Sequence, residues 1–82
     1  MVKVLIKKLD PSVKLPIYKT SGSSGMDLMA FLKDPVNVKV NTSSIIPTGL
    51  SIACSENYEI QIRPRSGLAA KNNIGVLNSP GT

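Results

Sequence analysis

The sequence predicts a small domain of the all-β class, and two features carry that prediction. Short stretches such as 36–40 and 58–62 alternate apolar and polar residues with the period of a β-strand. Turn-forming Gly, Pro, Asn and Ser residues separate these stretches. Aromatic residues are few, at 2 Tyr, 1 Phe and no Trp. We therefore expect a sandwich or barrel with an aliphatic core.

The expected elements are short and follow one another with turns between them. In chain order they are a strand at 2–7, a short extended piece at 15–18, strands at 26–32 and 36–40, and a strand at 45–53 with a Pro-Gly interruption. A tight turn at 55–57 leads into a strand at 58–63, and one two-turn helix at 66–72 and the start of a further strand at 75–77 follow. The turn residues 78–82 follow that last strand without a returning strand, which would leave sheet edges uncovered. We therefore expect residues 1–82 to form the N-terminal portion of a single larger domain.

Composition argues against several classes of function. Ten Lys and Arg against five Asp and Glu give a formal net charge of +5. The lysines are scattered and no aromatic stacking platform accompanies them, so we expect no nucleic-acid partner. Without His, and with Cys54 as the one cysteine, a zinc site and an internal disulfide are not expected. The longest apolar run, 28–32, is far too short to span a membrane, and the N-terminus lacks a secretory leader, so we expect a cytoplasmic protein with no membrane partner.

The most informative stretch is Arg63–Lys71, because it follows a strand-like alternation and opens the expected helix. It offers Arg65, the Ser66 hydroxyl and Gly67 at the N-terminus of the expected helix, where backbone N–H groups are unpaired. An Arg supplies a forked donor suited to phosphate oxygens, so the stretch indicates capture of an anion, above all phosphate. The alternative is structural: Pro64 ends the strand, Ser66 caps the helix and Arg65 is solvated.

Three further segments stand out as a set. Residues 25–30 read Gly-Met-Asp-Leu-Met-Ala, residues 64–69 read Pro-Arg-Ser-Gly-Leu-Ala, and residues 75–82 read Gly-Val-Leu-Asn-Ser-Pro-Gly-Thr. In this order they resemble the first signature motif, the core of the second and the opening of the third of the trimeric dUTP diphosphatases (dUTPases). The segment 46–50, Ile-Pro-Thr-Gly-Leu, is also typical of the family. The related dCTP deaminases share the fold, but their second motif usually lacks this form.

The resemblance implies a fold, an assembly and a reaction. It implies a jelly-roll-like β barrel of the dUTPase type, which these residues would form only in part, and a homotrimer with active sites between subunits. It also implies Mg²⁺ dependence and hydrolysis of dUTP to dUMP and pyrophosphate, in which an activated water attacks the α-phosphorus.

The same resemblance assigns roles to individual residues. Arg65, Ser66 and Gly67 would hold the phosphates, where an Arg, a hydroxyl and backbone N–H groups stabilise negative charge. Asn78 would hydrogen-bond the uracil, and Thr82 would lie beside the deoxyribose. Without the family, the turn that contains Asn78 has an ordinary structural explanation, since Asn, Pro and Gly favour turns.

Asp27 would help to organise the Mg²⁺–triphosphate side of the site, through water or neighbouring residues. Its structural alternative is a polar residue after a glycine turn. The family's general-base Asp is expected just past Thr82, followed by a Tyr, a fourth motif and a Gly-rich arm, none of which falls within the 82 residues. We therefore expect no catalytic carboxylate in this chain and no activity from it alone.

Three hypotheses about the whole follow. The first is a dUTPase-family enzyme of which the chain is a part. The second is a non-catalytic remnant, or a nucleotide-binding fragment that associates with a full-length subunit. The third and weakest is a basic nucleic-acid-binding module, for which the chain lacks stacking aromatic residues and clustered basic residues.

Overall fold

The computed structural model describes residues 2–82, which divide into two compact units. One unit comprises residues 5–53, and the other comprises residues 2–4 together with 54–82. The regular elements are two strands, β1 (Leu5–Lys8) and β2 (Leu50–Ala53), and one helix, α1 (Ser66–Asn72). Within residues 2–82, no helix has both the length and the apolarity that crossing a membrane requires.

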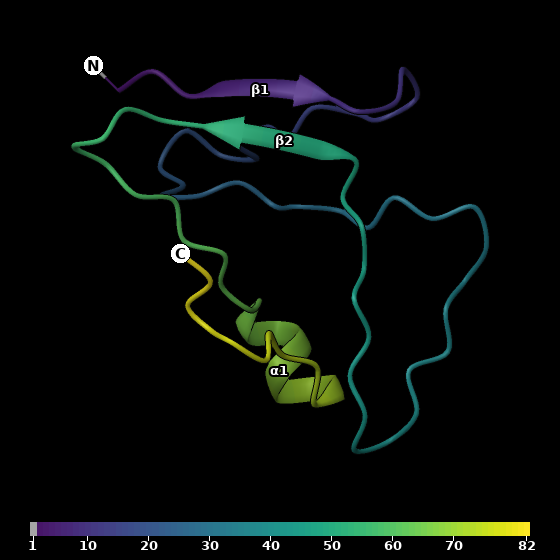
Figure 1. Ribbon diagram of the computed structural model, residues 1–82. Coiled ribbons are helices and arrows are strands. Elements are labelled where there is room, and N and C mark those ends of the chain that lie inside the picture. Colours follow the sequence, from purple (N-terminus) through teal and green to yellow (C-terminus); the bar gives the residue numbers. More distant parts are fainter. Residues whose placement is uncertain (1) are drawn as a thin grey trace. The chain divides into compact units, whose positions relative to one another are not determined.

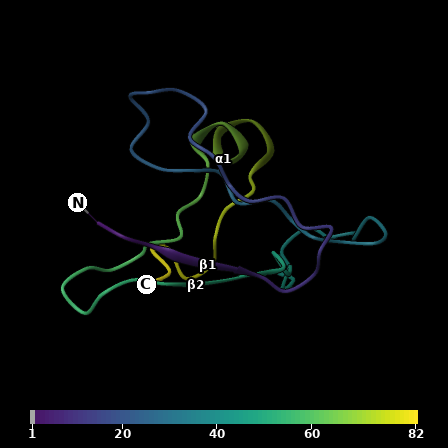
Figure 2. The ribbon, with the colours of Figure 1, turned by 90° about the horizontal axis from the view of Figure 1, so that it is seen from above.

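The unit of residues 5–53 is organised by the antiparallel pair β1 and β2, which lie side by side in both Figure 1 and Figure 2. Their register pairs Leu5 with Ala53 and Lys8 with Leu50. The ladder continues one step beyond β1, where the Leu9 N–H donates to the Gly49 carbonyl at 2.8 Å. On the segment just before β2, the Pro47 carbonyl accepts the Phe31 N–H, also at 2.8 Å. These two bonds connect residues 47–49 to Leu9 and to Phe31.

The tightest packing of this unit lies around Gly49. Among the described residues, Val13 is the buried hydrophobic side chain, at 6% exposed. Gly49 has φ +71°, and a Cβ built there would lie 2.6 Å from Val13 Cγ2 and 3.2 Å from the Phe31 ring. Both the backbone conformation and the close approach therefore require glycine at this position.

Residues 36–46 form a long arm of the same unit, which runs out from the strands and returns to β2 in Figure 1. Its turn is closed by the Thr42 N–H, which donates to the Lys39 carbonyl at 3.1 Å, and Asn41 takes the positive φ of 62°. The apolar side chains of the arm are exposed, up to 99% for Ile45. The alternation expected to make residues 36–40 a strand is present in the sequence, but no ladder includes this segment within residues 2–82.

The unit of residues 2–4 and 54–82 contains α1 and one isolated bridge. Ile62 and Gly81 pair antiparallel, with the Ile62 N–H donating to the Gly81 carbonyl at 2.7 Å and the Gly81 N–H donating to the Ile62 carbonyl at 2.9 Å. The turn expected at 55–57 is confirmed, because the Tyr58 N–H donates to the Ser55 carbonyl at 3.0 Å.

The predicted elements are confirmed unevenly. The helix has the predicted bounds, and β1 and β2 cover parts of the strands predicted at 2–7 and 45–53. The predictions of strands at 26–32, 36–40 and 75–77 are wrong for the described structure, and the predicted strand at 58–63 has only its bridge at Ile62. A strand needs a hydrogen-bonded neighbour as well as an alternating sequence. The described residues thus form a partial β domain with little sheet.

Candidate functional site

The start of α1 is built by Arg65, Ser66 and Gly67. Arg65 has extended backbone angles, φ −80° and ψ 128°, and its carbonyl accepts the Ala69 N–H at 3.0 Å, the first bond of the helix. Arg65 thus occupies the N-cap position, but its side chain makes no capping hydrogen bond to the first turn of the helix. The alternative that Ser66 caps the helix is wrong, because Ser66 is already helical. A Cβ at Gly67 would meet no atom within 4 Å, so this side of the first turn is open.

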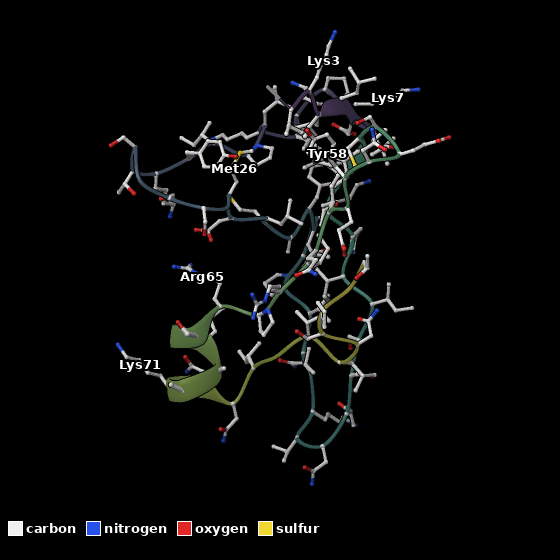
Figure 3. The ribbon with its side chains drawn as sticks, turned by 90° about the vertical axis from the view of Figure 1, so that its left-hand side faces the viewer. Lys3, Lys7, Met26, Tyr58, Arg65 and Lys71 are labelled. Carbon is white, nitrogen blue, oxygen red and sulfur yellow. The ribbon has the colours of Figure 1, made fainter. Side chains whose placement is uncertain are left out.

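The end of α1 explains why the helix stops after two turns. Asn73 takes the left-handed conformation, with φ 54° and ψ 36°, and its N–H donates to the Ala69 carbonyl at 3.2 Å. The Ile74 N–H donates to the Leu68 carbonyl, also at 3.2 Å. Lys71 in the last turn has the charge that the negative end of the helix dipole favours. Figure 3 shows the side chains of Arg65 and Lys71 extending outward from the two ends of the helix.

The third motif pairs with the segment that leads into the second. Gly81 pairs with Ile62, which stands three residues before Arg65. The Asn78 side chain lies close to Gly81, since a Cβ built at Gly81 would be 3.6 Å from Asn78 Nδ2. The structure therefore brings five predicted site residues into one unit, all of them exposed: Arg65, Ser66, Gly67, Asn78 and Thr82.

Asp27, the remaining predicted site residue, belongs to the unit of residues 5–53, and its surroundings are defined within that unit. Its carboxylate forms an ion pair with Lys19 Nζ at 3.4 Å, and the Asp27 side chain is 32% exposed. Sequence reasoning missed Lys19. The two residues are separated by the Ser/Gly loop, and no regular spacing in the sequence predicts their contact.

The described residues do not contain a ready-made metal centre. No group of three or more His, Cys, Asp or Glu side chains comes together in residues 2–82. Mg²⁺, however, is commonly held by one or two carboxylates together with substrate phosphates and water. Asp27 alone thus fits a supporting position beside a metal carried by a triphosphate, and does not fit a site that binds the ion without substrate.

Comparison with known proteins identifies the family. A family model described as dUTPase matches residues 11–79. The chain belongs to the dUTPase family. The matched region contains the whole of the first and second dUTPase motifs and most of the third.

Curated relatives match along all or nearly all of the chain. A deoxyuridine 5'-triphosphate nucleotidohydrolase of Rickettsia bellii (strain OSU 85-389) is 54% identical over 83 residues, covering 100% of this chain and 55% of the relative. The protein of the same name from Fusobacterium nucleatum is 49% identical, covering 100% of the chain and 57% of the relative. The protein of the same name from Treponema denticola is 52% identical over 75 residues, covering 92% of this chain and 52% of the relative. The chain thus spans about half the length of the dUTPase relatives it matches.

Proposed function

We propose that these residues supply the phosphate-binding and uracil-binding side of a dUTP diphosphatase, which converts dUTP to dUMP and pyrophosphate. The observation that carries the proposal is the pairing of Ile62 with Gly81 in a chain of the dUTPase family. That bridge pairs the third motif with the segment that leads into the second motif. Two groups of residues that the family uses to bind its substrate are therefore neighbours in one unit.

Each residue in that unit has chemistry suited to its proposed role. The Arg65 guanidinium and the Ser66 hydroxyl would donate to phosphate oxygens, and the open side of Gly67 would let a phosphate approach the backbone. Donors fixed before the reaction stabilise the charge that develops on these oxygens. Asn78 has both a donor and an acceptor for the uracil edge, and Thr82 would lie against the deoxyribose.

The wider features of the family are part of the same proposal. Mg²⁺ would neutralise charge on the triphosphate when bound, and Asp27 would orient water on that side while Lys19 restrains its carboxylate. Each complete subunit would form a jelly-roll-like barrel. A homotrimer of such subunits would bring motifs of different chains together in active sites between the subunits. The reaction belongs to nucleotide metabolism, and we place it in the cytoplasm.

The test is hydrolysis of dUTP by a chimera that joins residues 1–82 to the unmatched remainder of the Rickettsia bellii relative. The chimera should release pyrophosphate from dUTP with Mg²⁺, and should prefer dUTP to dCTP and dTTP. The 82-residue polypeptide alone should release none above background, because general-base catalysis contributes about 10²–10⁴-fold and no family base lies within it. A folded chimera that binds dUTP without hydrolysing it would favour the nucleotide-binding alternative, and one that binds no dUTP would overturn the proposal.

A further inference from the structure

The segment that leads into the second motif has one polar face. Its side chains alternate, with Ile60 and Ile62 half-buried and Glu59, Gln61 and Arg63 exposed. This alternation is that of an extended chain, whose successive side chains point to opposite sides, so the three polar side chains lie on one face. The proposed function uses none of the three.

The bridge between Ile62 and Gly81 fixes which residue of the third motif lies opposite that face. Each of the two donates its backbone N–H to the carbonyl of the other, at 2.7 and 2.9 Å, which is the hydrogen-bonded type of antiparallel pair. The register then places Gln61 opposite Thr82, in a pair of the non-hydrogen-bonded type, for which Cα atoms are typically about 4.5 Å apart and side chains lie closest. Gln61 and Thr82 therefore share a face, and both are exposed.

Glu59 fixes the orientation of the Gln61 side-chain amide. Gln61 Nε2 donates to Glu59 Oε2 at 3.3 Å, two residues back along the same face. An ionised carboxylate only accepts hydrogen bonds, and an amide carbonyl cannot donate one, so the NH2 group must be the part of the amide that faces Glu59. The carbonyl oxygen of the Gln61 side chain is consequently turned away from Glu59, where it can accept a hydrogen bond from a ligand.

We propose that Gln61 is a specificity-determining residue for the sugar, and that its side-chain carbonyl accepts a hydrogen bond from the 3′-hydroxyl of the substrate's deoxyribose. The inference rests on the proposed function, which puts Thr82 beside that sugar, and Gln61 is the side chain that the register sets opposite Thr82. The deoxyribose of dUTP has a single hydroxyl, at C3′, and a hydroxyl proton suits a carbonyl acceptor. Glu59 acts through Gln61 as a positioning residue, because it holds the amide in the orientation that presents the carbonyl.

The test compares hydrolysis of dUTP by the chimera with hydrolysis of 2′,3′-dideoxyuridine triphosphate, which lacks only the 3′-hydroxyl. The measured quantity is the ratio of kcat/KM for dUTP to kcat/KM for the dideoxy substrate. Gln61→Ala should lower this ratio by about threefold to tenfold, the range typical of one neutral hydrogen bond. Glu59→Ala should lower it in the same direction but less, because the amide keeps its carbonyl and loses its orientation. A purely structural role would slow both substrates equally and leave the ratio unchanged.

Asn72→Ala is the matched control, because it removes an exposed side-chain amide from the end of α1 in the same unit, outside the pairing with the third motif. It should leave the ratio within about twofold of the unsubstituted value, as expected for an independent site. Gln61→Met keeps the length of the side chain without the amide, and should give the same loss as Gln61→Ala.

Two failures are distinguishable. A chimera that hydrolyses dUTP, but in which Gln61→Ala and Gln61→Met leave the ratio unchanged, would overturn the contact with the 3′-hydroxyl and leave the proposed function standing. A folded, unsubstituted chimera that does not hydrolyse dUTP would overturn the proposed function and this inference with it.

Discussion

Gly49→Ala should destabilise the protein more than any other substitution of a glycine by alanine in the described residues. Gly49 has φ +71°, and the left-handed region costs an L-residue with a Cβ about 1–2 kcal/mol. The added Cβ would also lie 2.6 Å from Val13 Cγ2, and Val13 is the buried hydrophobic side chain of these residues. Overpacking of this kind typically costs about 1–3 kcal/mol. Together the two effects predict a loss of about 2–5 kcal/mol in the free energy of unfolding.

The assay is thermal unfolding of the chimera, followed by circular dichroism. A domain of the relatives' size loses about 2–4 °C in Tm for each kcal/mol, so Gly49→Ala should lower Tm by at least about 4 °C. Gly22→Ala is the matched control, since a Cβ at Gly22 meets no atom within 4 Å. It should leave Tm unchanged or raise it slightly, because alanine reduces the freedom of the unfolded chain. Equal Tm values for the two variants would refute the proposed packing around Val13.

Two further predictions concern the isolated chain and Asp10 in the chimera. The isolated 82-residue polypeptide should give broad or poorly dispersed amide NMR signals, because apolar side chains such as Ile45, at 99% exposed, lack cover; a sharp, dispersed spectrum from a monomer would contradict this. The pKa of Asp10 should be measured below its ordinary value, because its carboxylate accepts the Ser12 hydroxyl at 2.6 Å and the Ser12 N–H at 2.8 Å. Because this pKa is lowered, the ionised Asp10 stabilises the turn at residues 10–13 at pH values above the ordinary pKa of Asp. The contribution is lost as the pH falls through the pKa that Asp10 has in the folded state. In an NMR titration of the chimera, Ser12→Ala should raise the pKa of Asp10 part of the way back, and an unchanged pKa would rule out the hydroxyl as the main cause of the lowered value.

Local signals in the sequence predicted the helix well. The helix begins two residues after Pro64 and ends before Asn73, and Asn tolerates the left-handed conformation that ends a helix. These signals act within a few residues, so the bounds of α1 could be predicted without knowledge of the rest of the fold.

Strands could not be predicted in the same way, because a strand depends on its neighbour. Residues 36–40 alternate as cleanly as any segment of the chain, yet they form an exposed arm. Residues 5–8 and 50–53 alternate no better, but they face each other across a ladder. Which segments pair is decided by contacts between residues far apart in sequence, and the alternation alone does not contain that information.

The candidate site was predicted as a set of residues, and only part of its arrangement could be anticipated. The motif match named Arg65, Ser66 and Asn78, but the bridge between Ile62 and Gly81 that draws two motifs together has no local signal. The Lys19 partner of Asp27 is likewise a contact across a loop. The roles of these residues toward a substrate stay predictions.

The most direct test of the account is the effect of Arg65 on dUTP hydrolysis by the chimera. Arg65→Ala should lower kcat/KM by about tenfold or more, equivalent to at least ~1.4 kcal/mol of transition-state stabilisation. Its Tm should change little, because Arg65 is exposed and its side chain does not cap α1. Arg65→Lys should restore only part of the activity, since an ammonium cannot reproduce the planar fork.

Lys71→Ala is the matched control, because it removes one positive charge from the other end of the same helix. It should leave kcat/KM within about twofold of the unsubstituted chimera, as expected for a solvated surface charge. The account predicts a large loss of kcat/KM for Arg65→Ala alone, at unchanged Tm. Equal losses for the two variants, or an Arg65→Ala chimera that unfolds while its folded fraction keeps full activity, would contradict the assignment of Arg65 to the phosphates of dUTP.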